Sequence, residues 1–377
     1  MKKFLLFPLL LLLSGCWDTN QAERMYYIHG LGIDYKDEQY EIYAQIVAFT
    51  NIAKSEQPNP DATQAEVGFA TGRTFDEAFF NLYQTMDERV FLGHLKYVIF
   101  SENIAKENKV EPIVNSFIRY RELRYTTWAY MTNSPLDEVL LITPIINKSI
   151  TLSKLSDPLS SYSQSSRIRP IQFRELMIQL NEPSYEAKIP LVDISENWSK
   201  EDGPDPVYTF KGINILHRNS GFKGNLLGDD LNGVQWLIDQ TKRSDVTIKM
   251  GESEERYTTS TVDEVHTEII PVVTENKVHF DINVKLVVQT NEILNQQKMD
   301  VLKKAIERQV KKEIEQTYKA SLEFDTDIYR LSEVLYRKNV KVWKEHEKDG
   351  KIPLDESTIR NLDVELVKVK GERITSD

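Results

Sequence analysis

The chain has very little cysteine: Cys16 is the only one among 377 residues. A single cysteine excludes an intramolecular disulfide and any metal site built from cysteines alone. After residue 13 there is also no apolar run of the roughly 18 residues that a membrane-spanning helix needs. Positive charge is in deficit, with 47 Lys and Arg against 58 Asp and Glu and a net charge of −11. These deficits argue against a polytopic membrane protein and against a nucleic-acid-binding protein with a broad basic field.

Patterns typical of catalysis or ligand binding are missing as well. The six histidines are scattered, with no His-x-x-x-His or His-x-His pair that would suit a metal ion. Gly30-x-Gly32 lacks the third glycine and the helix of a dinucleotide-binding loop, and no serine lies in a Gly-x-Ser-x-Gly elbow. Asp325-x-Asp327 lacks the further oxygens of a calcium loop, so we interpret Asp325 as a helix cap. The sequence predicts no catalytic residue, no bound metal and no cofactor.

The N-terminus carries a processing signal. Lys2 and Lys3 precede an apolar run over residues 4–13, which leads into Leu13-Ser14-Gly15-Cys16. This order is typical of a secretory signal peptide, and its last four residues are similar to a bacterial lipobox. We expect residues 1–15 to be cleaved and Cys16 to receive diacylglycerol and an N-acyl chain, which together give stable anchoring. Residues 16–24 would then form a lipidated tether, in which the stretch from Trp17 to Arg24 reaches roughly 27 Å at full extension.

The rest of the chain predicts an α+β fold of three mixed α/β domains with largely antiparallel sheets. The N-terminal α/β domain is expected over residues 25–150, the middle domain over 151–245 and the C-terminal domain over 246–377. Residues 26–33 and 40–50 alternate as a strand pair, and Thr74 opens a helix with a capping box. Further elements are expected as a loop at 51–66, a strand at 97–100, a helix at 104–120, a strand at 125–131 and a helix capped by Ser134-Pro135.

The middle and C-terminal domains have different patterns. In the middle domain we expect a serine-rich linker at 153–166, a helix at 167–180, a break at 201–206, a hairpin over 207–216 and 222–227, and a helix at 231–240. In the C-terminal domain we expect strands at 246–250, 262–273, 277–290 and 362–369 and a helix at 328–347. A long amphipathic helix precedes that last helix. Its apolar stripe is Met299, Leu302, Ile306, Val310, Ile314 and Tyr318.

Several short motifs occur in a fixed order from the lipobox to the last helix. They are Cys16-Trp17-Asp18, Gly30-x-Gly32-Ile33-Asp34, Phe210-Lys211-Gly212, Asn232-Gly233-Val234-Gln235-Trp236-Leu237 and Tyr336-Arg337-Lys338 followed by Trp343. As an ordered set they resemble the Ger(x)C family of spore germination lipoproteins. Members of this family are the C subunits of nutrient germinant receptors in spore-forming Gram-positive bacteria. Asn214 and His217 depart from the resemblance, because the family tends to be more apolar there.

The resemblance implies a function as well as a fold. It implies a non-catalytic subunit, lipid-anchored to the outer face of the spore inner membrane and needed for the germination response to nutrients. It also implies contact with two membrane-embedded partners, the A and B subunits, and no contact with nucleic acid. Cys16 is the one functional residue that the family's pattern supplies, as the site of lipidation.

One basic and aromatic patch stands out as a candidate docking surface. It consists of Arg119, Arg121, Arg124, Tyr125 and Trp128. Arginine and aromatic residues are favoured at protein interfaces. The same residues also fit a solvated helix end and strand edge, and the sequence leaves both interpretations open.

Two other classes of protein remain as alternatives. A solute-binding lipoprotein would itself capture a small nutrient, but it requires two similar lobes around a cleft, and the three segments are unlike. The only feature that favours a lipoprotein hydrolase is the expected location, anchored outside the cytoplasm.

Overall fold

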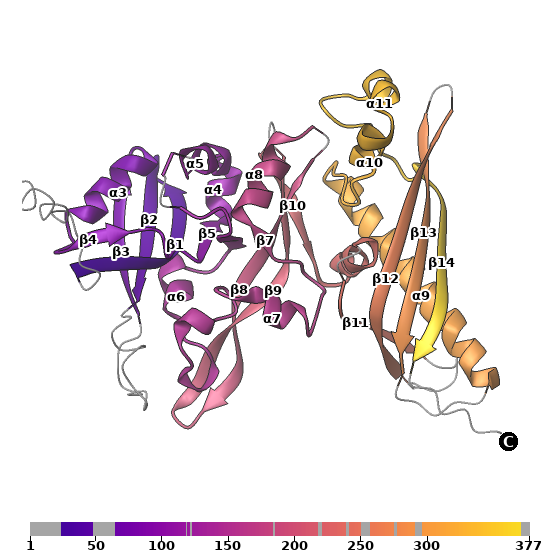
Figure 1. The fold of residues 1–377 in the computed structure, drawn as a ribbon, viewed down its shortest axis with the longest axis horizontal. Helices are drawn as coiled ribbons and strands as arrows, with labels where there is room; N and C mark the ends of the chain where they lie inside the picture. The colour runs from indigo at the N-terminus through magenta and orange to yellow at the C-terminus, as the bar shows by residue number, and fades with distance from the viewer. Residues whose placement is uncertain are drawn as a thin grey trace, which may run out of the picture.

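The computed structural model describes residues 24–47, 65–117, 119–120, 123–183, 185–217, 221–238, 241–249, 257–274, 277–290 and 296–370 (Figure 1). The expected signal peptide, Cys16 and Arg121 lie outside the described residues, and so does most of the loop expected at 51–66. Within these ranges no helix is both long and apolar enough to cross a membrane. The predicted α+β fold with largely antiparallel sheets is confirmed.

A ten-stranded sheet occupies the left and centre of Figure 1. Its strands are β1 (Met25–Lys36), β2 (Gln39–Val47), β3 (Ala65–Gly72), β4 (Arg89–Phe91), β5 (Tyr97–Ser101), β6 (Trp128–Thr132), β7 (Ile171–Gln172), β8 (Ala187–Lys200), β9 (Gly203–His217) and β10 (Gly221–Leu227). Their main order is β10-β9-β8-β6-β5-β1-β2-β3. β6 and β8 pair in parallel, with Met131 opposite Leu191. The sheet therefore runs without a break across residue 150, where a domain boundary was expected.

Helices cover both faces of this sheet because apolar side chains alternate along its central strands. One face packs against α3 (Phe75–Tyr83), α4 (Glu102–Lys106), α5 (Val110–Phe117) and α8 (Phe173–Asn181). The other face packs against α6 (Leu136–Leu141) and the chain that follows it. That chain comprises the short 3₁₀ helices η2 (Ile145–Asn147) and η3 (Ile150–Leu152) and then α7 (Pro158–Tyr162).

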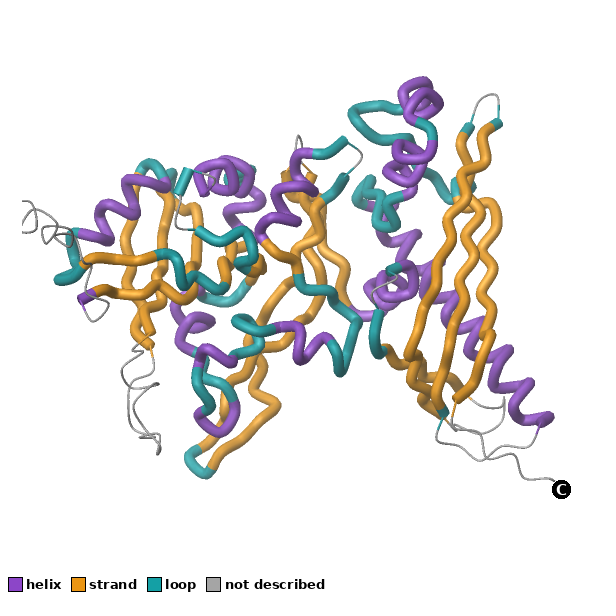
Figure 2. Tube along the Cα trace, in the orientation of Figure 1, coloured by secondary structure: helices purple, strands orange, loops and turns teal. Residues whose placement is uncertain are grey.

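A second, four-stranded sheet lies at the right of Figure 1, and Figure 2 shows the long helix running across it. Its strands, in order, are β11 (Ser244–Lys249), β12 (Tyr257–Val273), β13 (Val278–Gln289) and β14 (Ile359–Lys370). Its helices are η4 (Gly228–Leu237), α9 (Gln296–Glu323), α10 (Leu331–Lys338) and α11 (Val340–His346). The predicted stripe of α9 is confirmed, since all six of its residues are buried. One hydrophobic core contains side chains of this unit together with Ile213, Ile215 and Leu226 of the first sheet.

Several local predictions are also confirmed. β1 and β2 form the expected hairpin around the turn residues Asp37 and Glu38, both with positive φ. Thr74 caps α3 by accepting the Glu77 backbone N–H at 3.0 Å. β9 and β10 form the later hairpin.

Other local predictions are wrong for identifiable reasons. The helix expected at 104–120 is two helices, separated where Asn108 adopts φ +56°. Ser134 does not cap α6, because its hydroxyl instead donates to the Asp193 carboxylate. The helix expected at 328–347 is also two, since Asn339 ends α10 and caps α11. Asp325 is not the cap of α10; both carboxylate oxygens of Asp327 accept backbone N–H groups of Leu331 and Ser332, at 2.9 and 2.7 Å.

Composition misled two further predictions. The serine-rich segment 153–166 is a packed part of the fold, with Ser153, Ser156 and Ser166 buried and hydrogen-bonded. The break expected at 201–206 is confined to a turn at residues 201–202, and β9 begins at Gly203 and includes both prolines.

Two further elements differ from the prediction. The helix expected at 231–240 is the 3₁₀ helix η4, and the sequence does not predict β3.

Candidate functional site

One serine–histidine contact has the elements of nucleophilic chemistry. His29 Nε2 lies 2.8 Å from Ser156 Oγ, and both side chains are buried. The other ring nitrogen, His29 Nδ1, has no hydrogen-bond partner among the described residues, so no carboxylate orients the ring. Burial lowers the pKa of His29 to about 4, with Lys96 adding to the effect. A neutral, buried histidine of this kind has a structural role, as part of the packed interior.

The described residues also contain no group of three or more His, Cys, Asp or Glu side chains arranged to hold a metal ion.

The predicted docking patch is spread over two faces of the first sheet. Arg119 follows α5, is exposed and donates to Ser116 Oγ at 2.8 Å. Arg124 and Tyr125 are exposed in the loop before β6. Trp128 packs with the core on the face opposite α5. Arg121 lies outside the described residues, so docking at this patch stays a prediction.

The glycine-containing motifs explain close packing. A Cβ on Gly30 would overlap the ring of Tyr97, and one on Gly32 would press on Leu136 and Leu140 of α6. A Cβ on Gly212 would overlap the backbone carbonyl of Leu226 in the neighbouring strand. These positions therefore need glycine for contact between elements.

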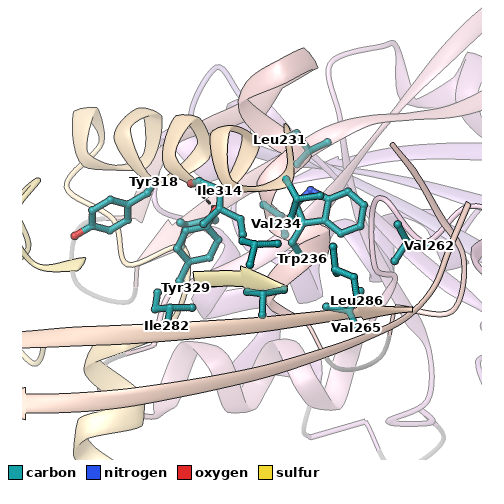
Figure 3. Close-up of a cluster of buried hydrophobic side chains, with 14 of the residues drawn as sticks. Leu231, Val234, Trp236, Val262, Val265, Ile282, Leu286, Ile314, Tyr318 and Tyr329 are labelled. Atoms are coloured by element: carbon teal, nitrogen blue, oxygen red, sulfur yellow. Dashed lines mark hydrogen bonds between the residues drawn. The ribbon is translucent and has the colours of Figure 1, made fainter. Parts of the chain in front are cut away.

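The Asn232–Leu237 motif fastens η4 onto α9 (Figure 3). Trp236 is fully buried, and its Nε1 donates to Glu313 Oε2 at 2.7 Å. The backbone N–H of Gly233 donates to Thr317 Oγ1 at 2.8 Å, and a Cβ there would collide with the Glu313 carbonyl. The motif therefore secures the connection between the first sheet and the C-terminal unit.

The two units also meet through buried and half-buried charged groups, which sequence reasoning missed. We call Glu186, Lys188, Asp327 and Lys351 the ionic junction. Glu186 and Lys188 lie at the start of β8, whereas Asp327 and Lys351 flank α10 and α11. Lys351 Nζ lies 3.2 Å from Glu186 Oε1, and Glu186 Oε2 accepts the backbone N–H of Asp327. Lys188 Nζ donates to the Ile328 carbonyl at 2.6 Å. The four charges sum to zero when all are ionised.

Burial shifts the pKa values of Glu186, Lys188 and Asp327 toward their neutral forms. It raises the pKa of Glu186, an effect that Lys351 opposes. It raises the pKa of Asp327 to about 6, and Glu186 adds to the rise while two backbone N–H groups oppose it. It lowers the pKa of Lys188 to about 8, with Arg330 contributing in the same direction. Burial therefore disfavours charge at the junction, and the contacts of these groups with one another and with the backbone offset that cost.

A second set of contacts surrounds the junction. Glu333 is 3% exposed and accepts hydrogen bonds from Arg330 and Arg337. The Arg330 guanidinium lies over the Tyr185 ring, 4.3 Å from its centroid, and Arg337 lies 3.6 Å from Glu182. Through these contacts α10 is held against the chain that leads into β8.

A hollow of about 440 Å³ lies elsewhere, on the open face of the second sheet. Its lining includes two rows of directly opposed residues on β12, β13 and β14. The rows are His266, Lys285, Glu365 and Glu268, Asn283, Asp363. The hollow is polar, open to solvent and separate from the ionic junction.

Comparison with protein families covers most of the chain. The family described as "Spore germination protein N-terminal domain" matches residues 18–194. The family described as "Spore germination B3/ GerAC like, C-terminal" matches residues 211–370. The two matches lie in the same order as the two units of the structure.

Individual relatives are similar over nearly the full length. Spore germination protein KC of Bacillus subtilis (strain 168) is 22% identical over 91% of this chain and 89% of its own. Spore germination protein B3 of the same organism is 23% identical over 89% of this chain and 90% of its own. The crystal structure of the GerBC protein matches with a TM-score of 0.56 and 18% identity, over 91% of this chain and 97% of that one. At this level of identity, the match shows that the two chains share a fold.

Proposed function

Because this chain belongs to the Ger(x)C family of spore germination proteins, we propose that it is the lipid-anchored, non-catalytic C subunit of a nutrient germinant receptor. Diacylglycerol and an N-acyl chain on Cys16 hold it at the outer face of the spore inner membrane. There it contacts the membrane-embedded A and B subunits. The anchor confines the chain to two dimensions and so raises its effective concentration at these partners.

The ionic junction is the observation that carries this proposal. Its charged groups lie between the two units, so their contacts favour one relative orientation of these units. They lie outside the hollow on the second sheet. Buried ion pairs add little net stability compared with apolar packing, but they penalise every arrangement that separates the partners. A subunit that passes a conformational change from one partner to another needs two bodies in a defined relative position. We infer that the junction defines this position.

The function is tested with spores that lack this chain. We expect such spores to lose the response to one nutrient class, measured as the fall in optical density, while other nutrient classes still trigger germination. The wild-type chain should restore the response and Cys16→Ala should not. Ser14→Ala keeps a small residue in the lipobox and serves as the matched control, which should restore it. A full response to every nutrient in the strain without the chain would contradict the proposal.

A solute-binding role is the second candidate, and the hollow on the second sheet favours it. Lys285 lies between His266 and Glu365 there, and the next row holds Glu268 and Asp363. Positive and negative side chains so close together suit a zwitterion such as an amino acid. Calorimetric titration of the chain with amino acids and sugars tests this role. Saturable binding that is lost in both Lys285→Met and Asp363→Asn would support it, and no heat of binding would exclude it for the nutrients tried.

A further inference from the structure

The connection between α6 and α7 differs in charge from the rest of the chain. Residues 142–157 contain Lys148 and Lys154 against one acidic residue, Asp157, although the whole chain has 58 acids and a net charge of −11. Lys148 is exposed and makes no ion pair with any other described residue. The Lys154 ammonium lies over the ring of Phe210, 4.8 Å from its centroid. This stretch is a local basic segment on an acidic protein.

The same segment exposes apolar side chains at its tip, which we define as Ile145–Leu152. Ile146 is 80% exposed and Leu152 is 66% exposed, and Leu141 at the end of α6 is 49% exposed. Ile146 also has φ +53°, a left-handed conformation that β-branched residues rarely adopt. Backbone strain of this kind persists only where the surrounding structure enforces it, and it is concentrated at functional sites.

The tip stands on a rigid base. Ile150, within the tip, and Leu155, just after it, are fully buried. The Tyr130 hydroxyl donates to the Leu155 carbonyl at 3.0 Å, and His29 Nε2 contacts Ser156 Oγ at 2.8 Å. The Tyr208 hydroxyl donates to the Val139 carbonyl at 2.8 Å, which ties the segment to β9. The exposed apolar side chains are therefore presented by fixed structure.

Exposed apolar side chains beside the exposed Lys148 match the two layers of an anionic membrane surface, which are the acyl region and the phosphate headgroups. Only seven residues separate the expected lipidation site Cys16 from Arg24, the first described residue. The body is thus held within a short reach of the bilayer. We infer that the tip is a second membrane contact that inserts Ile146 and Leu152 among anionic phospholipids. This inference rests on the proposed lipid anchor.

The experiment uses the full lipidated chain on vesicles of phosphatidylglycerol and phosphatidylcholine. The Cys16 sulfur is blocked by its lipid, so a fluorescent label on Ile146→Cys marks the tip alone. A nitroxide on the phospholipid acyl chains quenches a label that enters the bilayer. Asp202→Cys, exposed in the acidic turn between β8 and β9, is the matched control. We expect strong quenching at position 146 and at Leu152→Cys, and little at position 202. Adding Lys148→Glu to Ile146→Cys should reduce the quenching.

Flotation of the vesicles separates the two proposals. If the chain does not float, the lipid anchor is wrong, and this inference falls with it. If the chain floats and the labels at 146 and 152 stay unquenched, the inference is overturned while the anchor stands. Labels that stay unquenched on vesicles alone and become protected only when the A and B subunits are present would overturn it too, because they assign the tip to a protein partner.

Discussion

The Nζ atom of Lys351 lies 3.2 Å from Oε1 of Glu186, a residue 165 positions earlier in the chain. The Lys351 side chain is 13% exposed and that of Glu186 is 3% exposed. This contact joins the end of the C-terminal helices to the start of β8. It therefore connects the two parts of the chain that the two family matches describe separately.

Lys351→Met should destabilise the protein by about 3 kcal/mol, since removing one partner of a buried pair leaves the other charge uncompensated. Urea unfolding measures the effect. Lys277→Met is the matched control, because it removes an ion pair to Asp355 in which both side chains are more than half exposed. We expect the control to cost less than about 1 kcal/mol. Equal losses in the two variants would contradict a special role for the junction.

The raised pKa of Asp327 makes the stability of the protein depend on pH. This pKa is raised from 3.8 to about 6, chiefly by burial. The folded chain thus binds this proton more tightly than the unfolded chain does. The resulting stability is fully present below about pH 4 and is lost as pH rises through 6. Asp327→Asn removes this titration, so the stability of the wild type minus that of the variant should fall between pH 4 and 6. If the difference in stability between the wild type and Asp327→Asn is flat or rises between pH 4 and 6, the pKa of Asp327 is not raised.

Trp236→Phe should lower the free energy of unfolding by about 2 to 4 kcal/mol, because it leaves a cavity and removes the hydrogen bond to the buried Glu313. Thermal unfolding of the full chain measures this effect. Trp198→Phe changes a side chain that is 51% exposed and should cost less than about 0.5 kcal/mol. If the two variants unfold at the same temperature, η4 is not fastened to α9 in the way described.

Asn214→Leu should stabilise the protein. Asn214 is fully buried on β9, and neither its Oδ1 nor its Nδ2 has a hydrogen-bond partner among the described residues. Replacing an unpaired buried amide by an apolar side chain with the same branching should raise the free energy of unfolding by about 1 to 3 kcal/mol. Asn283→Leu on the open face of the second sheet should change it by less than about 0.5 kcal/mol. A loss of stability in Asn214→Leu would contradict the interpretation of Asn214 as an unpaired, destabilising amide.

The basic patch gives a prediction about partner contact. Arg121→Glu combined with Arg124→Glu should abolish the nutrient response of spores while the chain remains lipidated, folded and present at normal levels. The control is Lys341→Glu combined with Lys344→Glu, which makes the same charge change on the exposed face of α11. Normal germination with the arginine variants would remove the patch as a docking surface.

The elements that the sequence predicted well are those set by local periodicity. The α9 stripe repeats every three to four residues, so burial of one helix face follows from the sequence alone. The β8–β9 hairpin was missed because of Pro204 and Pro206. In the structure this part of β9 extends past β10, which pairs only from Gly212 onward. Proline is tolerated at such a free edge, because the missing N–H has no partner to lose.

The ionic junction could not be predicted for a different reason. Its members are distant in sequence and belong to no repeat, so nothing local distinguishes Lys351 or Glu186 from the solvated charges around them. They meet because the two units pack together, through the docking of η4 on α9 and the hydrophobic core that includes Ile213, Ile215 and Leu226. The cap of α10 shows the same limit at short range: Asp325 and Asp327 are equivalent in pattern, and only Asp327 points at the free N–H groups.

The most direct test of a junction that serves receptor function is the nutrient response of spores carrying Lys351→Met, compared with Lys277→Met at equal protein levels. We predict that Lys351→Met slows or abolishes the fall in optical density for one nutrient class, while Lys277→Met germinates like the wild type. Wild-type germination by both variants would contradict a functional role for the contact between Glu186 and Lys351.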